Sequence, residues 1–296
     1  MRQWLIFIYL GCVAWGTSFL WIKVALQELG PITLVGWRFL FGLVTVALSV
    51  VILKHRIVFR GLRFWLPAGL GVLGGAIPIV LISWAEQSID SGLAGVLNST
   101  MPIWTMLIAH FALHDDRMTP GRLTGLVTGF VGIYILLDPR GSATHDLVGQ
   151  LAVVAAAIFY ATATVLQHRH LSGVHPLQSS LPAMLGATVV LAITAAIVEG
   201  PLSLPKEPMT WLACAWMGII GMGLAVQAWY HLINHWGATR TSLVTYVFPV
   251  AAVALGVVIL DERLTWELVV GGVLIIGGIA LVNRKAEDRV SEPVTG

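Results

Sequence analysis

Three charged side chains lie inside or beside long apolar stretches, where charge is costly and is by default functional. Arg38 lies roughly two turns inside the start of one stretch, Lys23 one turn inside the end of the preceding stretch, and Glu86 directly after a third. We expect all three at one depth. Arg38 and Glu86 could then form a gate or contact a zwitterionic solute. The alternative is a cluster of ion pairs, with Lys23 extending to the membrane surface.

Two polar residues each precede a proline by four positions inside an apolar stretch. A proline within a helix cannot donate its backbone hydrogen bond, and it displaces the carbonyl four residues earlier. Pro102 therefore predicts a kink with a free carbonyl at Asn98, and Pro249 predicts the same at Thr245. Free backbone groups at membrane depth must face protein or a wet cavity. We expect Asn98 and Thr245 to contact a solute, the alternative being a kink satisfied by neighbouring helices.

Aromatic and small polar residues recur at one depth in both halves of the chain. Trp15 lies close to Thr17, and its counterpart 145 residues later is Tyr160. Gln227 and Tyr230 add an amide and a phenol at helical spacing. These five side chains predict the wall of a central cavity. Packing between helices is the competing interpretation.

Histidines occur in two pairs with a spacing of four, which places both rings of a pair on one helical face. The pairs are His110 with His114 and His231 with His235. Such pairs can bind a metal, but no further strong ligands accompany them, and we find no phosphate-binding loop, nucleophile elbow or Cys-x-x-Cys motif. We therefore predict no metal and no other cofactor. An intramembrane metalloenzyme is retained as an alternative.

The composition is that of a protein embedded in lipid. Mean hydropathy is +0.86, and 57% of residues are apolar against 11% charged, where soluble domains have about 25% charged residues. A helix crosses the hydrocarbon layer with roughly 20 apolar residues. Ten such stretches lie near 5–26, 32–53, 64–85, 92–113, 122–137, 149–167, 176–198, 211–233, 240–260 and 266–283. We predict an all-α integral membrane protein with ten transmembrane helices.

Lysine and arginine predict the orientation, because they accumulate on the cytoplasmic side of bacterial inner-membrane proteins. With a cytoplasmic N-terminus, the inner connections and ends hold Arg2, Lys54, Arg56, Arg60, Arg63, Arg117, Arg122, Arg169, Arg240, Arg284, Lys285 and Arg289. The outer side holds Arg140, Lys206 and Arg263. Both termini are therefore expected in the cytoplasm. The net charge of +2 gives no reason to expect nucleic acid as a partner.

The second half of the chain repeats the pattern of the first. Pro102 and Pro249 are 147 residues apart, and each apolar stretch ends at an acidic residue followed by arginine, Asp116-Arg117 or Glu262-Arg263. Five helices per repeat is an odd number, so the halves must enter the membrane from opposite sides. We expect repeats at 5–137 and 149–283, a cytoplasmic tail at 284–296, and a solute site between the halves.

The repeated segments are IDSGLAGVLNSTMPIWTMLIAHFALHDDRMTPGRLTGLVTGFVGIYILL and GATRTSLVTYVFPVAAVALGVVILDERLTWELVVGGVLIIGGIALV. They resemble the two EamA domains of the drug/metabolite transporter superfamily, and VAWGTSFLWIKVAL with Trp37-Arg38-Phe39 resembles its first two helices. The resemblance implies two inverted repeats of five helices around a central cavity, and export or exchange of small metabolites. One departure is Asp115-Asp116 where the second repeat has Asp261-Glu262.

We therefore predict a secondary transporter of the inner membrane that moves amino acids or similar small solutes by alternating access. Its expected partners are the small-molecule substrate and the lipid bilayer, with no nucleic acid, and it would be a monomer or a homodimer. A non-transporting scaffold or sensor is the third possibility, beside the transporter and the metalloenzyme.

Overall fold

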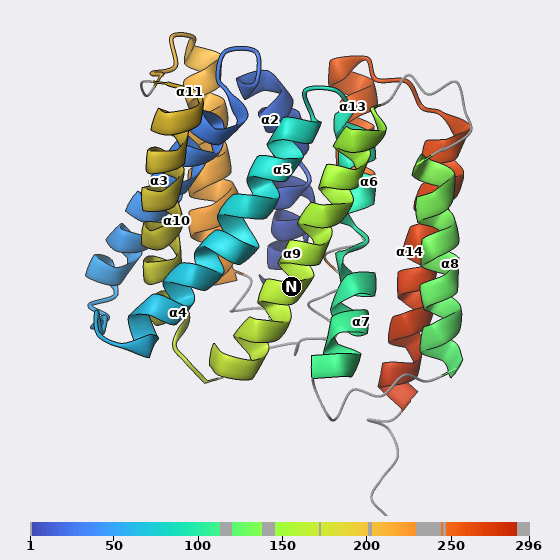
Figure 1. Ribbon diagram of the computed structural model, residues 1–296, viewed down its shortest axis with the longest axis horizontal. Coiled ribbons are helices and arrows are strands. Elements are labelled where there is room, and N and C mark those ends of the chain that lie inside the picture. The colour runs from blue at the N-terminus through green and yellow to red at the C-terminus, as the bar shows by residue number, and fades with distance from the viewer. Residues whose placement is uncertain are drawn as a thin grey trace, which may run out of the picture.

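The computed structural model describes residues 2–112, 120–137, 146–171, 173–200, 203–228, 244 and 247–288. Within these ranges the regular structure is entirely helical, with no strand. The helices form one bundle, with most axes running between the upper and lower ends in Figure 1. The prediction of an all-α protein is confirmed.

Helices of the first half follow one another through short connections. Their bounds are α1 Arg2–Ile8, η1 Tyr9–Trp15, α2 Ser18–Ala25, α3 Pro31–Ile52, α4 Leu62–Gly71, η2 Val72–Ala76, α5 Ile77–Ala85, α6 Ser91–Asn98, α7 Met101–Ala112 and α8 Pro120–Leu137. The second half contains α9 Leu147–Leu171, α10 Pro176–Val198, α11 Pro208–Ala215, η3 Trp216–Leu224, α13 Phe248–Leu260 and α14 Trp266–Asp288.

Seven of the described helical runs are long and apolar enough to cross a membrane. They are Gln3–Ala25, Pro31–Ile52, Leu62–Ala85, Ser91–Phe111, Leu147–Leu171, Pro176–Val198 and Pro208–Ala228, and shorter apolar helices occupy Leu123–Leu136, Phe248–Leu260 and Trp266–Gly278. Large apolar side chains such as Val258 and Ile197 are more than three-quarters exposed. Lipid is the environment that favours such a surface.

Three helical runs contain a wide π-helical segment, and each segment includes glycine: η1, η2 and η3. Such segments widen the helix locally and often occur at functional sites. Here η1 and η3 pack against each other, so two widened turns from opposite halves of the chain meet inside the bundle.

Helices α8 and α14 lie side by side at one edge of the bundle, at the right of Figure 1. Glycines allow their backbones to touch. A Cβ atom at Gly278 would lie 2.6 Å from the Gly125 carbonyl oxygen, and one at Gly132 would lie 2.8 Å from that of Gly271. Small residues at such crossings let dispersion forces hold membrane helices together.

Helices α3 and α10 pack together near the opposite edge, and each also contacts the other half of the chain, α3 at η3 and α10 at α4. Glycine permits both contacts. A Cβ atom at Gly218 would lie 2.6 Å from the Arg38 carbonyl oxygen, and one at Gly71 would clash with the Ala183 carbonyl oxygen. The Arg38 backbone is therefore held against η3.

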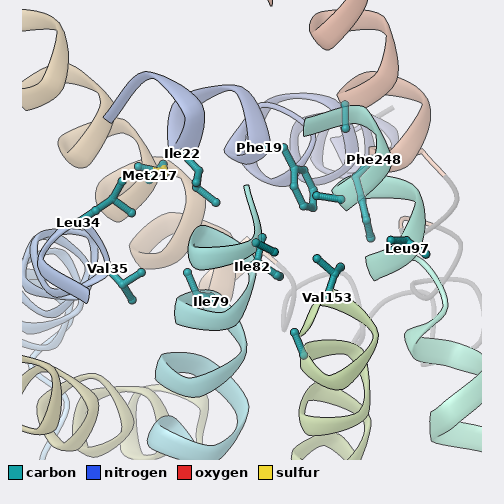
Figure 2. Packing of buried hydrophobic residues seen from close by; sticks show 14 of the residues in the cluster. Phe19, Ile22, Leu34, Val35, Ile79, Ile82, Leu97, Val153, Met217 and Phe248 are labelled. Atoms are coloured by element: carbon teal, nitrogen blue, oxygen red, sulfur yellow. The ribbon is translucent and has the colours of Figure 1, made fainter. Parts of the chain in front are cut away.

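An apolar core joins these helices (Figure 2). Phe19 of α2 stacks on Phe248 of α13 with ring centroids 6.3 Å apart. Ile82 of α5 and Val153 of α9 belong to the same buried cluster. This core surrounds the few polar groups described next.

Candidate functional site

Arg38 lies in the interior of the bundle, where its side chain is 6% exposed. Nη2 donates to Ser18 Oγ at 3.4 Å and Nη1 approaches Met217 Sδ at 3.7 Å. Nε has no hydrogen-bond partner among the described residues. A guanidinium with five donors is thus only weakly satisfied by the protein, so it retains the capacity to bind an anionic group.

Glu86 is the residue directly after α5, and its side chain is 1% exposed. Neither carboxylate oxygen has a hydrogen-bond partner within the described part of the chain. Its charged neighbours are Lys23, Glu262 and Arg38. The structure thus brings Lys23, Arg38 and Glu86 into one electrostatic neighbourhood without a hydrogen bond from either cation to the Glu86 carboxylate. The gating role predicted for Arg38 and Glu86 stays a prediction.

Tyr160 of α9 belongs to the same neighbourhood, because its phenol interacts electrostatically with Arg38. Trp15 and Thr17 lie beside η3. The Trp15 indole donates to the Gly221 carbonyl oxygen at 3.1 Å, and Thr17 Oγ1 accepts from the Trp216 indole at 3.0 Å. These bonds join the two halves of the chain, so both residues have a packing role.

Gln227 lies at a different level of the bundle. Its Nε2 donates to Ser49 Oγ at 2.7 Å and to the Gly223 carbonyl oxygen at 3.1 Å. Ser49 is eleven residues beyond Arg38 along α3, which corresponds to about 16 Å of helix. Gln227 therefore does not join the Arg38 neighbourhood. Tyr230 and Thr245 lie outside the described residues, so their predicted roles stay predictions.

The two prolines each lie at the start of a helix. Asn98 ends α6, the turn residues Ser99 and Thr100 follow, and Pro102 is the second residue of α7. Pro249 is likewise the second residue of α13, where proline costs no hydrogen bond. The segment around Pro102 is thus two helices with a break. Asn98 Oδ1 is buried in this break without a hydrogen-bond partner among the described residues.

Glutamates from one half of the chain bind the helix N-termini of the other half, which the sequence interpretation missed. Glu262, after α13, accepts hydrogen bonds from the backbone N–H groups of Ser91 at 2.7 Å and Gly92 at 2.9 Å, the first residues of α6. A Cβ atom at Gly256 would clash with the Glu262 carboxylate. A carboxylate at a helix N-terminus satisfies free N–H groups and complements the helix dipole.

Two further carboxylates make the same kind of contact. Glu199, after α10, accepts from the N–H groups of Ile32 and Thr33 at 2.8 Å each. Glu28, after α2, accepts from the N–H groups of Lys206 and Glu207. Desolvation alone would raise the pKa of Glu28, but hydrogen bonds led by that from Lys206 hold it below its ordinary value.

These three glutamates define what we call the carboxylate end of the bundle, uppermost in Figure 1, where α2, α5 and α13 end and α6 and α11 begin. A signal for them exists in the sequence. Each lies just beyond the end of an apolar helix, and that position faces the start of another helix in an antiparallel bundle. Which helix each would cap depends on long-range packing, which spacing does not reveal.

Of the four paired histidines, only His110 of α7 is described, and its ring contacts Phe111. The others lie outside the described ranges. Within those ranges no group of three or more histidine, cysteine or carboxylate side chains is arranged to hold a metal ion.

A bundle of apolar helices with buried charges of both signs defines a multi-span membrane protein. The EamA-like transporter family model matches residues 2–138 and again residues 147–284. The chain therefore belongs to the EamA-like transporter family, which confirms the resemblance noted from the repeated segments.

Related proteins of similar length are named as transporters. The chain is 28% identical over 280 residues to the uncharacterized transporter YoaV of Bacillus subtilis, covering 90% of this chain and 91% of that protein. It is 22% identical over 287 residues to a probable amino-acid metabolite efflux pump of Escherichia coli, covering 90% of each. It is 26% identical to the uncharacterized inner membrane transporter YedA of Escherichia coli, covering 86% of this chain and 81% of YedA.

A solved crystal structure has the same fold, with a TM-score of 0.69 at 21% identity, covering 98% of this chain and 99% of the solved one.

Proposed function

We propose that the protein is a secondary transporter that exports amino acids or similar small solutes across the inner membrane by alternating access. The observation that carries this proposal is the pair of buried opposite charges, Arg38 and Glu86, both with unpartnered polar atoms among the described residues. Buried polar groups without partners are costly. An amino acid supplies a carboxylate for the Arg38 guanidinium.

The relatives support the transport class and suggest the solute. One is named as an amino-acid metabolite efflux pump and another as an inner membrane transporter. These names favour a transporter over a metalloenzyme or a scaffold. Asn98 contributes an unpartnered amide oxygen and Tyr160 a phenol near Arg38, so both are proposed to contact solute beside the charged pair.

Ten helices in two inverted repeats remain the layout that we propose. Reciprocal glycine contacts support it: Gly132 meets Gly271 and Gly125 meets Gly278, and an offset of 146 residues converts the first contact into the second. Likewise Gly71 approaches the Ala183 carbonyl as Gly218 approaches that of Arg38. A two-fold axis relating the halves produces such exchanges.

In the proposed orientation both termini are cytoplasmic and the carboxylate end faces the periplasm. Reporter fusions test this directly. Fusions at residue 60 and after residue 284 should report the cytoplasm, and one at residue 204 the periplasm. A periplasmic signal at residue 60 would reverse the orientation.

A ligand screen tests the solute class. An amino acid that binds the folded protein raises its apparent melting temperature by mass action. Arg38→Gln should abolish that shift, and Arg169→Gln, at an exposed position, should preserve it. If no amino acid or related metabolite shifts the melting temperature of the wild type, the proposed solute class is wrong.

A further inference from the structure

Glu86 has a burial and bonding pattern that solute binding alone leaves unexplained. Both carboxylate oxygens are buried without a hydrogen-bond partner in the described ranges, and so is the hydroxyl of Ser83, three residues earlier on the same face of α5. Removal from water opposes the charged form of a carboxyl group. A bound proton cancels that charge without needing a shell of ligands.

The charged groups around Glu86 come from three other elements. Lys23 of α2 and Arg38 of α3 attract the carboxylate, whereas Glu262 after α13 repels it. The Arg38 guanidinium is directed to Ser18 and Met217. A metal cation would be repelled by Lys23 and Arg38, whereas a proton leaves Glu86 neutral beside them.

Glu262 connects this buried carboxyl group to the carboxylate end. Its oxygens accept from Ser91 and Gly92, and Ser91 lies five residues after Glu86, beyond the short connection 87–90. Glu262 thus holds the end of α13 on the start of α6, directly beside the segment that leads from Glu86. Separation of α13 from α6 would both expose that segment to water and remove the repulsion from Glu262.

We propose that Glu86 is a proton-binding site whose access to water at the carboxylate end is controlled by Glu262. When Glu262 is on α6, one proton is held on a Glu86 oxygen. When α13 leaves α6, the proton is released to water and the carboxylate is hydrated. The inference rests on the proposed transport function for its role in coupling, but proton binding itself can be measured without any solute.

Infrared difference spectroscopy between neutral and alkaline pH tests the site in the purified full-length protein, because exposed carboxylates are already ionised at neutral pH whereas the proton proposed on Glu86 is still bound. The wild type should show the carbonyl band of a protonated buried carboxyl group, and Glu86→Gln should lack that band. Glu207→Gln removes an exposed carboxylate near the same end and should retain the band. Persistence of the band in Glu86→Gln, or its absence from the wild type, overturns the proposal whatever the protein transports.

Coupling is tested in proteoliposomes that contain a pH-sensitive dye and the amino acid with the largest melting-temperature shift. Solute efflux by the wild type should move protons, whereas Glu86→Gln should exchange solute for solute without proton movement. Glu262→Gln, which weakens the hold of α13 on α6, should speed proton release while preserving the carboxyl band. A correctly folded Glu86→Gln protein that no longer exchanges solute would instead make Glu86 a solute contact and overturn the proton site. Absence of solute exchange from every protein would contradict the transport function and leave the infrared result to decide on the site.

Discussion

Glu262 Oε1 accepts a hydrogen bond from the Ser91 backbone N–H at 2.7 Å, across 171 residues of sequence. The bond ties the end of α13 to the start of α6, and Glu262 Oε2 binds Gly92 N–H beside it at 2.9 Å. An exchange between two orientations requires contacts that form in one state and break in the other. This pair of bonds meets that requirement, because both bonds are accepted by the carboxylate of Glu262 and can form or break together.

Glu262→Ala should destabilise the conformation described here, because two N–H groups of α6 lose their acceptor. Loss of a helix N-terminal acceptor typically costs about 1 kcal/mol. Cysteine labelling at the carboxylate end should then be faster in the variant than in the wild type. The matched control is Glu267→Ala in α14. Unchanged labelling in Glu262→Ala would show that Glu262 does not hold the end of α13 on the start of α6.

Adjacent glycines of α14 provide a test of the helix crossing. A Cβ atom at Gly278 would meet the backbone of Gly125 and Gly129 within 2.7 Å, whereas Gly277 has no such atom within 4 Å. Gly278→Ala should therefore lower stability by about 1–3 kcal/mol, and Gly277→Ala should be neutral or slightly stabilising through helix propensity. Thermal unfolding of both variants measures the difference, and equal effects would contradict the close α8–α14 contact.

Asn98 allows a structural role to be separated from a functional one. Its Oδ1 is buried without a partner among the described residues, so Asn98→Leu removes a polar group that costs stability and should fold at least as well as the wild type. Transport should fall roughly tenfold or more if that oxygen binds solute, because a lost hydrogen bond leaves a solute group unpaired at about 1–3 kcal/mol. Wild-type transport by the variant would place the solute elsewhere.

His175 predicts a pH response at the opposite end of the bundle. Burial, and then the nearby His55 ring, lower the pKa of His175 below its ordinary value. The rings stack with centroids 4.0 Å apart, and His175 Nδ1 accepts from the Leu177 N–H at the start of α10. The folded state thus favours neutral His175, so its contribution to stability is complete above the unfolded-state pKa and is lost as the pH falls through the lower folded-state pKa.

Hydrogen exchange of the first turn of α10 should therefore accelerate on acidification. His175→Asn keeps an N-terminal acceptor without a titrating ring and should exchange independently of that titration. An identical acid response in both proteins would assign the effect to another group.

The sequence predicted the helical class and most span positions, because the apolar length needed to cross a membrane is fixed by the bilayer. It predicted α10 closely, since proline begins the helix at Pro176 and the apolar run ends at Val198. It did not predict the break after Asn98, because a proline alone is compatible with either a kinked helix or the start of a new one. The placement of Pro102 near the start of α7 depends on the turn at Ser99 and Thr100.

The candidate site was predictable by residue type but not by partnership. Arg38 and Glu86 were identified because charge is rare in apolar stretches. Their neighbours were not predictable in this way: Arg38 contacts Ser18 and Met217, Glu86 lies near Glu262, and these residues come from segments far apart in sequence. The Trp15 and Thr17 bonds to η3 depend on long-range packing in the same way. Hydropathy and spacing specify which residues are buried, whereas packing decides which of them meet.

Solute counterflow in proteoliposomes is the most direct test of the central claim. Protein reconstituted into vesicles loaded with an unlabelled amino acid should accumulate the labelled amino acid transiently, and Arg38→Gln should abolish this accumulation while Arg169→Gln preserves it. Alternating access requires this result, because a single solute site must return loaded from one side to the other. If wild-type vesicles accumulate none of the amino acids or related metabolites tested above the level of protein-free vesicles, the proposed transport function is contradicted.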